Sequence, residues 1–303
     1  MRENDLLQHI YATSGGLASQ FPGVSIPPGD DMGAVAVGGQ IVLMTVDQVA
    51  DGVHVDLANT PLAKVGRKCI TRNLSDVAAM AARPVGAVAA ACLPRDFGEA
   101  NATALFDAMR ATAERYSCPL IGGDISMWDG KLIVTVTIFA EPAGIEPIRR
   151  GTARPGDGLY VTGTLGNSLA SGHHLNFEPR IELARKLAGD PRTRPTAMID
   201  LSDGLAQDLP RLTDHALIEA ALLPIRAGTP GQDDWRWRHA VGDGEDYELL
   251  FALAPEGASH LPRQIDGVPI TRIGRVAGDG GVCLALPDGQ RPALEGMGWE
   301  HVA

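Results

Sequence analysis

The sequence predicts a soluble α/β protein with two domains. Its 303 residues exceed the usual size of a single hydrophobic core, and 45% hydrophobic residues are enough to fill two. Short apolar, β-branched runs alternate with segments of helical periodicity, which is typical of α/β chains. With 36 glycines, 21 prolines and only 5% aromatic residues, the composition favours many tight connections over a long helical bundle.

The chain opens with apolar residues at helical spacing over 6–11, which predict a short amphipathic helix. A loop rich in glycine and proline then leads to two adjacent acids, Asp30 and Asp31. The apolar run Ile41–Val46 predicts a buried strand that ends at Asp47. Ligands gather at strand ends in α/β folds, so Asp47 is a candidate site residue.

Thr60 and Pro61 predict the start of a helix, as a capping residue followed by a first-turn proline. Asn73 and Asp76 lie three residues apart on this helix and share a face, which is also the pattern of a solvated surface. The elements expected next are a strand over Val85–Leu93, a helix over Glu99–Tyr116, a buried strand over Leu120–Ile121 and a strand over Leu132–Phe139. Together they predict a domain of β-α-β-β-α-β type.

The motif Gly122-Gly123-Asp124 follows the short apolar run, and we interpret it as a tight turn that carries a carboxylate. Two glycines allow the backbone to present N–H groups to a phosphate, and the aspartate beside them requires a cation in between.

The basic segment 148–157 contains proline and glycine, so we place the domain boundary there, with domains 1–148 and 149–303. An arginine fork in this segment is able to pair with a phosphate, although an arginine-rich linker is more often simply solvated. Beyond it we expect strands over Leu159–Thr162 and Tyr247–Ala254, a strand that ends at Met198–Ile199, and helices over Pro179–Leu187 and from Leu205 to Leu212.

A polar turn over 200–204 contains Asp200, Ser202 and Asp203 and precedes the helix that starts near Leu205. A serine or aspartate directly before a helix is usually an N-cap, so capping alone is the alternative role for one of Ser202 and Asp203. Towards the end of the chain, Thr271–Val276 and Val282–Leu286 predict two strands joined by a glycine-rich turn.

The net charge of -11 disfavours nucleic acid and anionic membranes as partners and favours metal cations. The four cysteines are scattered and form no C-x-x-C pair, so neither a zinc site nor a disulfide framework is indicated. We find no secretory signal and no apolar run long enough to span a bilayer, and therefore expect a cytoplasmic protein.

Several of these aspartates are predicted to converge: Asp31, Asp47, Asp76, Asp124 and Asp200. Two carboxylates about 4 Å apart repel by roughly 4 kcal/mol at an effective dielectric constant of about 20, so such a cluster needs cations. Carboxylates without histidine or cysteine ligands favour Mg²⁺, which usually keeps coordination sites for substrate phosphates. The chain contains neither a P-loop nor protein-kinase motifs, so we expect phosphoryl transfer by another fold.

An ordered set of motifs resembles the thiamine-monophosphate kinase family, which belongs with aminoimidazole ribonucleotide synthetase. The resemblance covers nearly the whole chain and is carried by the segments 29–31, 45–47 with 52–54, 73–76 with 78–80, 121–124, 199–204 and 244–249. It implies the two-domain synthetase-like fold, with an N-terminal domain that dimerises and a C-terminal α/β domain. It also implies transfer of the γ-phosphoryl group of ATP to thiamine monophosphate without a protein nucleophile.

The resemblance also implies roles for individual residues. Asp47, Asp76 and Asp124 would be catalytic, nucleotide contacts would be made by Gly123, Asp124, Arg150 and Ser202, and substrate contacts by His54, Glu245 and Trp299. Several magnesium ions would be held by Asp31, Thr45, Val46, Asp47, Asp76, Asp124, Asp200 and Asp203. Without the resemblance, His54 would be an ordinary histidine at a strand end, Glu245 a turn acid and Trp299 a packing residue.

The chain departs from the family pattern at four places. Val46 replaces a threonine, so only its backbone carbonyl is available to a metal. Ala82 and Asp243 replace glycines, and the segment Gly172–Pro179 is short. Two alternatives therefore stay open: another ATP-using enzyme of the superfamily, and a nucleotide-binding descendant without catalysis.

Overall fold

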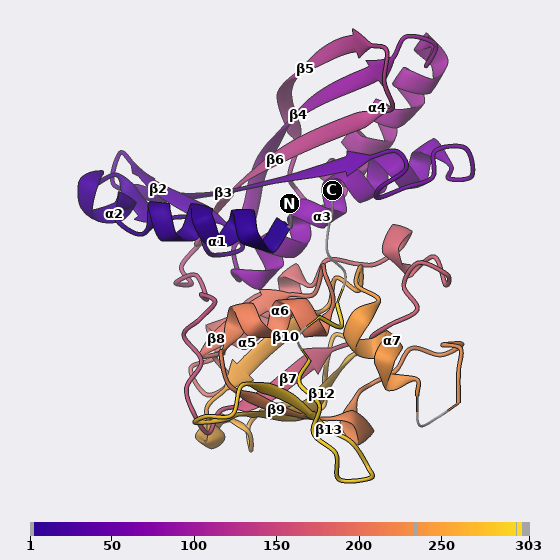
Figure 1. Cartoon of the computed structure of the whole chain (residues 1–303). Helices are drawn as coiled ribbons and strands as arrows, with labels where there is room; N and C mark the ends of the chain where they lie inside the picture. The colour runs from indigo at the N-terminus through magenta and orange to yellow at the C-terminus, as the bar shows by residue number, and fades with distance from the viewer. Residues whose placement is uncertain (1–2, 233–234, 295, 299–303) are drawn as a thin grey trace.

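The computed structural model describes residues 3–232, 235–294 and 296–298, and it contains two β-sheets with helices packed against them (Figure 1). The first sheet has six strands in the order β1-β2-β3-β6-β4-β5. Its strands are β1 (Val24–Ile26), β2 (Gly33–Val37), β3 (Gln40–Ala50), β4 (Arg83–Pro94), β5 (Leu120–Trp128) and β6 (Ile133–Glu141). Neighbouring strands are antiparallel except for the parallel pair β4 and β5.

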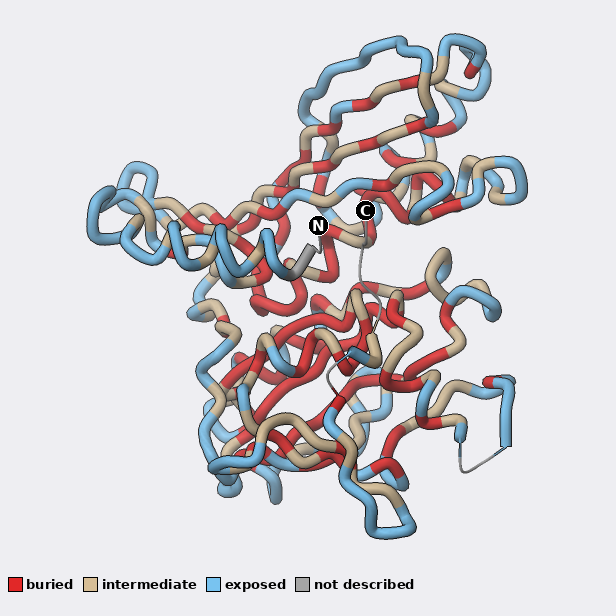
Figure 2. Tube along the Cα trace, in the orientation of Figure 1, coloured by how far each residue is buried: buried red, intermediate tan, exposed pale blue. Residues whose placement is uncertain are grey.

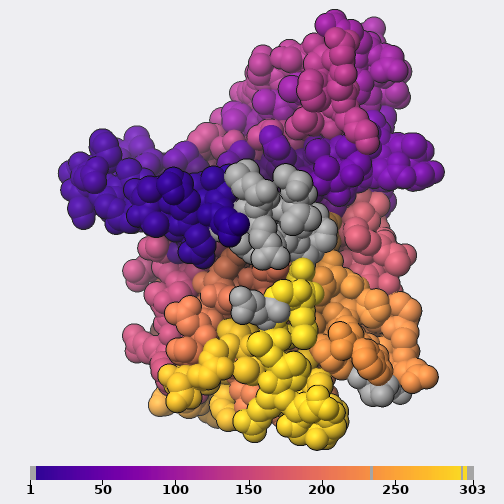
Figure 3. Space-filling view, in the orientation of Figure 1, coloured from indigo at the N-terminus to yellow at the C-terminus, as the bar shows by residue number. Residues whose placement is uncertain are grey.

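The helices of this part are α1 (Glu3–Ser14), α2 (Leu17–Gln20), α3 (Leu62–Ala79) and α4 (Glu99–Arg115). From β3 onwards the order along the chain is β-α-β-α-β-β, which is the order in which the sequence predicts the individual elements. Only the type β-α-β-β-α-β assigned to the whole domain is wrong, because the helix α4 precedes β5 and a tight connection joins β5 to β6. Helix α3 is capped at Pro61, not at Thr60, and no side chain bonds to its first turn. The helix α1 confirms the predicted amphipathic segment and lies on the surface of the molecule (Figure 3).

The second sheet has the order β13-β9-β12-β7-β10-β8, and β11 pairs with β12. Its strands are β7 (Gly158–Thr162), β8 (Ala197–Asp200), β9 (Ala216–Glu219), β10 (Leu249–Leu253), β11 (Gln264–Ile265), β12 (Val268–Val276) and β13 (Val282–Ala285). The helical segments are η1 (His173–Leu175), α5 (Ile181–Gly189), α6 (Leu205–Leu212), η2 (Ala220–Leu222), α7 (Trp237–Gly242) and η3 (Pro255–Gly257).

The strands β12 and β13 do not form the expected hairpin. Strand β9 lies between them, antiparallel to β12 and parallel to β13. The four residues of β9 are too few for a recognisable pattern, and its pairing partners come from much later in the chain. The α/β class itself is confirmed.

Two hydrophobic cores fill the molecule. One runs from the first sheet through α3 and α4 to α5 and one face of the second sheet, and the other lies between the opposite face of that sheet and helices α6 and α7. Residues of β10 alternate between the two cores, which explains why this strand is apolar along its whole length. The predicted boundary at 148/149 falls in the connector between the sheets, and the division into two domains stays a prediction.

Helix α3 lies at the junction of the two parts and contacts β3 and β6 on one side and β8 and α5 on the other. Strand β5, in contrast, is the outer edge of the first sheet, and eight of its nine residues are exposed (Figure 2). The expectation that Leu120 and Ile121 form a buried strand is therefore wrong in this chain, since Ile121 is 68% exposed.

Candidate functional site

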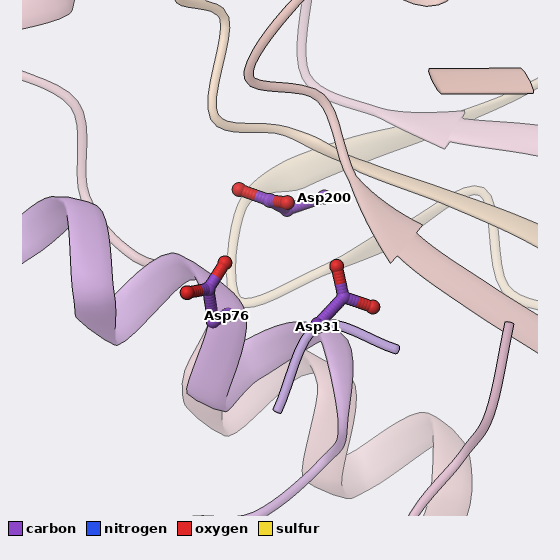
Figure 4. A group of neighbouring side chains, drawn as sticks. All are labelled: Asp31, Asp76 and Asp200. Carbon is purple, nitrogen blue, oxygen red and sulfur yellow. The ribbon is translucent and has the colours of Figure 1, made fainter. Parts of the chain in front are cut away.

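Three carboxylates meet at the junction between the sheets. Asp31 comes from the loop before β2, Asp76 from the last turn of α3, and Asp200 from the end of β8. One oxygen of each lies within 4.8 Å of the others, and Figure 4 shows the three side chains directed toward one another. We call these residues the acidic triad.

The surroundings of the acidic triad penalise its negative charge. Desolvation raises the pKa of Asp76 well above its usual range, and the charges of Asp47, Asp200 and Asp31 raise it further. Burial, with the charge of Asp31, raises the pKa of Asp200 to about 7. These shifts mean that protons or cations must compensate the triad.

Hydrogen bonds satisfy only part of the triad. The hydroxyl of Thr45 donates to Asp76, that of Ser75 to Asp200 at 2.6 Å, and Arg150 donates to Asp31 at 2.6 Å. The second carboxylate oxygen of Asp31 is buried and has no protein partner. An unpartnered buried oxygen among carboxylates and a threonine hydroxyl fits a hard cation such as Mg²⁺.

Strand β3 supplies the next residues. Thr45 is buried and faces the triad, Val46 on the opposite face is 61% exposed, and Asp47 is again turned inward. Asp47 lies inside β3 and not at its end, because the strand continues to Ala50 in register with β6. Its partner is Arg72 of α3, whose Nη2 lies 3.5 Å from Asp47 Oδ1.

Asp124 does not join the triad within one chain. The motif Gly122-Gly123-Asp124 continues β5 and forms no turn, which corrects the prediction, and the side chain of Asp124 is exposed. Across the sheet, Asp47 aligns with Val136, then Ala89, then Gly123. Strands β3 and β5, which carry Asp47 and Gly123, are therefore three strand spacings apart, or roughly 14 Å.

Position 123 requires glycine because of strand packing, and not because of a turn. A Cβ atom at this position would lie 1.9 Å from the carbonyl oxygen of Ala89 on β4. Only glycine therefore allows β4 and β5 to pair this closely.

The turn after β8 places Ser202 and Asp203 beside α6, but neither caps the helix. The capping residue is Gly204, and no side chain bonds to the first turn. Asp203 instead pairs with Arg211 at 2.8 Å, and its backbone N–H donates to the buried Asp208 at 3.0 Å. Asp208, which we did not predict, thus fixes the shape of this turn.

A cavity of about 220 Å³ is lined by neighbours of the triad, namely Asp47, whose charge raises the pKa of Asp76, and Ser202 and Asp203, which follow Asp200 in the chain. It brings together five of the predicted residues, Asp47, His54, Ser202, Asp203 and Glu245. The remaining lining residues are Val53, Arg72, Leu169, Asp243 and Gly244. Trp299, the third predicted substrate residue, lies outside the described residues.

Lys68 of α3 is completely buried and contacts three residues, two of which, His54 and Glu245, line the cavity. Its Nζ donates to Glu245, to the carbonyl of His54 at 2.8 Å, and contacts His174 Nδ1 at 3.1 Å. We call Lys68, His174 and Glu245 the lysine cluster. The sequence does indicate that Lys68 is buried, because it lies three residues after Val65 on the inward face of the helix. It does not indicate the partners of Lys68, because they are distant in sequence.

The electrostatics of the lysine cluster are opposite to those of the triad. Burial alone would raise the pKa of Glu245, but the contact with His174 and the charges of Lys68 and Arg72 outweigh it and lower the pKa to about 2. Glu245 is therefore a firmly ionised carboxylate. Burial lowers the pKa of Lys68, and Glu245 opposes that shift.

The turn that carries Glu245 is held from several sides. Glu245 and Tyr247 both have positive φ, 59° and 49°, which residues with side chains rarely adopt. Asp246 accepts two bonds from the N–H of Gly166 and pairs with Arg226 at 3.0 Å. Tyr247 stacks on Phe177 with 4.1 Å between the ring centroids.

The structure shows what two of the departures from the family pattern do, Asp243 and the short segment 172–179. Asp243 accepts the N–H of Asn167 at 2.7 Å and contacts His239 Nδ1 at 3.0 Å, so it ties the substrate turn to the loop after β7. The short segment 172–179 contains η1 and delivers His174 and Phe177 to the lysine cluster and its turn.

One face of α3 links all these features. Lys68, Arg72 and Asp76 follow one another at intervals of four residues, which places them along one side of the helix. Lys68 belongs to the lysine cluster, Arg72 lines the cavity and Asp76 belongs to the acidic triad.

The fold and the acidic triad indicate the broad class to which the protein belongs. Residues 29–141 match the N-terminal domain of AIR synthase related proteins. With its two sheets and the acidic triad between them, the chain has the α/β fold of that class.

The particular family follows from full-length similarity. The chain is 35% identical over 310 residues to the thiamine-monophosphate kinase of Rhodopirellula baltica, covering 97% of this chain and 96% of that protein. The chain belongs to the thiamine-monophosphate kinase family.

Solved structures agree with this assignment. The thiamine-monophosphate kinase of Stenotrophomonas maltophilia K279a superposes with a TM-score of 0.72 at 29% identity, over 96% of this chain and 99% of that one. A structure described as "AaThiL complexed with AMPPCP and TMP" reaches a TM-score of 0.80 at 27% identity, over 99% and 97% of the two chains. Among the described residues, no helix has the length and apolar character needed to cross a bilayer.

Proposed function

We propose that this protein transfers the γ-phosphoryl group of ATP to the phosphate of thiamine monophosphate and so forms thiamine diphosphate. The observation that carries the proposal is a cavity that joins His54 and Glu245 to Asp47, the residue whose charge acts on Asp76 of the acidic triad, in a chain of this family. The similar structure that holds AMPPCP and TMP supports the same pair of substrates.

The donor set is suited to magnesium ions. We propose that they are held by the carboxylates Asp31, Asp47, Asp76, Asp124, Asp200 and Asp203, with the hydroxyl of Thr45 and the backbone carbonyl of Val46. When bound, magnesium supplies positive charge that neutralises the phosphates of ATP and the transferring group.

The residues of the chain position the two substrates. We propose nucleotide contacts for Gly123, Asp124, Arg150 and Ser202, and contacts with thiamine monophosphate for His54, Glu245 and Trp299. Glu245 stays ionised above a pH of about 2, and its carboxylate lines the cavity while it accepts hydrogen bonds from Lys68 and Tyr247. Catalysis then consists mainly of alignment, since the acceptor phosphate is itself the nucleophile.

The position of Asp124 supports a homodimer. Strand β5 is an exposed edge of nine residues with apolar side chains such as Ile125 and Met127, each 57% exposed. Such edges are normally covered. We propose that a second copy pairs along this part of the first sheet and that Asp124 of each copy completes the metal site of the other. A location in the cytoplasm and the absence of a nucleic-acid partner stay predictions.

The activity is tested with purified protein, ATP, Mg²⁺ and thiamine monophosphate, by detection of ADP and thiamine diphosphate together. Stoichiometric formation of both supports the proposal. Nucleotide binding without either product would identify a non-catalytic descendant, and ATP consumption that requires a different acceptor would identify another enzyme of the superfamily.

The dimer is tested by light scattering and by complementation. A monomer of about 32 kDa at micromolar concentration would contradict it. If Asp124 acts across the interface, the inactive variants Asp124→Asn and Asp76→Asn regain activity when they are refolded together, because the mixed dimer contains one intact site. If Asp124 acts within its own chain, the mixture stays inactive.

A further inference from the structure

The cavity contains one cation whose bonding capacity is largely unused, Arg72 of α3. Its side chain is 12% exposed and lines the cavity together with His54, Glu245 and Asp47. Nη1 donates to the carbonyl of Gln48 at 2.7 Å, Nη2 makes only the long 3.5 Å contact with Asp47, and Nε has no hydrogen-bond partner. A guanidinium has five N–H donors, so most of this fork is uncommitted.

The neighbouring cations are already paired. Lys68 is bound by Glu245, Arg211 by Asp203 at 2.8 Å, and Arg150 by Asp31 at 2.6 Å. The acids of the cavity also have partners, since Asp243 contacts His239 and accepts the N–H of Asn167. Of these four cations among the described residues, Arg72 has the longest contact with a carboxylate, 3.5 Å to Asp47.

A phosphate cannot approach this cavity without positive charge. Four carboxylates line it, Asp47, Asp203, Asp243 and Glu245, and each would repel a dianion. Arginine is the side chain best suited to such a ligand, because its planar fork binds two phosphate oxygens at once.

The position of Arg72 along α3 fits the acceptor. It lies one helical turn from Asp76, about 6 Å along the helix axis, and one turn from Lys68 on the other side. An acceptor phosphate at Arg72 would therefore lie between the acidic triad and the groups held by the lysine cluster.

We propose that Arg72 binds the phosphate of thiamine monophosphate and neutralises its charge during transfer, an inference that rests on the proposed function. An oxygen of this phosphate, already deprotonated at neutral pH, forms a bond to the γ-phosphorus of ATP. The bond from that phosphorus to the β–γ bridging oxygen breaks, and ADP leaves with the electron pair. The guanidinium takes up no proton and reduces the repulsion between the two phosphates as they meet.

The test compares Arg72→Met, which removes the fork, and Arg72→Lys, which keeps the charge, with wild type. Arg110→Met serves as a matched control, since Arg110 is a 60% exposed arginine paired with Asp107 on the surface of α4. We expect Arg72→Met to lower kcat/KM for thiamine monophosphate by about 10²-fold while KM for ATP changes by less than about twofold. Arg72→Lys should recover part of the loss, and the control should match wild type.

A second readout separates phosphate binding from a general structural role. Calorimetry gives the affinity of each protein for thiamine monophosphate and for thiamine, which lacks the phosphate. The ratio of the two affinities should fall at least about tenfold in Arg72→Met. An equal loss for both ligands, or an unchanged ratio, would overturn the assignment, and melting temperatures identify any variant that does not fold.

The outcomes distinguish the two proposals. Wild-type protein that forms no thiamine diphosphate contradicts the proposed function. Wild-type turnover together with an unchanged affinity ratio in a folded Arg72→Met contradicts only the role of Arg72.

Discussion

The two ends of the functional face of α3 handle buried charge in opposite ways. In the acidic triad, like charges face one another and one buried oxygen of Asp31 has no partner. In the lysine cluster, a buried cation and a half-buried anion satisfy each other, with His174 as a third member. The triad is therefore incomplete without a ligand, whereas the cluster is complete in the protein alone.

This contrast predicts different results for mutations at the two ends. At the triad, loss of a charge should harm function and leave the fold intact. At the lysine cluster, loss of a charge should harm the fold itself, because a partner is left buried and unpaired.

The largest effect is expected for Asp76→Asn. Turnover should fall by about 10³-fold or more, because the residue is one of the three carboxylates of the triad and is proposed to bind metal. The metal-free variant should melt at or above the wild-type temperature, since repulsion within the triad decreases. Wild type should be stabilised by Mg²⁺ with ATP by roughly 2.7 kcal/mol at a hundredfold excess over Kd, and the variant should lose most of this.

Activity assays and thermal melts with and without chelator measure these effects. A metal-free variant that melts well below wild type, or one with a full metal-dependent shift, would show that the triad is not a cation site.

The second effect is expected for Lys68→Met, which leaves the half-buried Glu245 without its hydrogen-bonded cation. The free energy of unfolding should decrease by about 3–5 kcal/mol. Addition of Glu245→Gln should restore part of this stability, since the unpaired charge is then gone. Urea unfolding of the single and double variants measures the coupling, and additive losses would mean that the two residues do not stabilise each other.

The third effect depends on pH. The pKa of Glu245 is about 2 in the folded protein and 4.5 ordinarily, so its contribution to stability is present above about pH 4.5. It is lost as the pH falls toward 2. Over this window the stability difference between wild type and Glu245→Gln should shrink by up to about 3 kcal/mol, because one pKa unit corresponds to about 1.4 kcal/mol. A difference that is constant with pH in urea unfolding would contradict the assigned ionisation.

The smallest effect is expected where a charge pair is exposed to water. Lys186 and Asp266 form such a pair, with side chains 55% and 49% exposed. Lys186→Met should change the free energy of unfolding by less than about 1 kcal/mol and leave turnover unchanged. A larger loss would show that solvent exposure does not explain why the Lys186–Asp266 pair contributes less to stability than the Lys68–Glu245 pair.

The sequence predicts the parts of the site that local patterns determine. Asp76 follows from helical spacing on α3, and Asp200 from a strand that ends in a polar turn. Both contribute to the acidic triad as expected, together with Asp31.

Other features depend on contacts between distant segments and leave little local signal. Lys68, His174 and Glu245 come from α3, η1 and the turn before β10, and only the packed structure brings them together. The sequence predicts a turn at Gly123 because glycine is common in turns, whereas the structure requires glycine there because β4 approaches so closely. The short strand β9 has no recognisable pattern and inserts between strands that come later in the chain.

Because Lys68, Arg72 and Asp76 lie on one helix, α3 fixes the distances between the lysine cluster, the cavity and the acidic triad. Because each residue of a helix adds about 1.5 Å and 100° of rotation, Lys68 and Asp76 stay about 12 Å apart on one side of the helix. A single inserted or deleted residue between them would turn Asp76 away from Asp31 and Asp200 without changing any side chain. Evolution can therefore exchange residues along this stretch more easily than it can change its length.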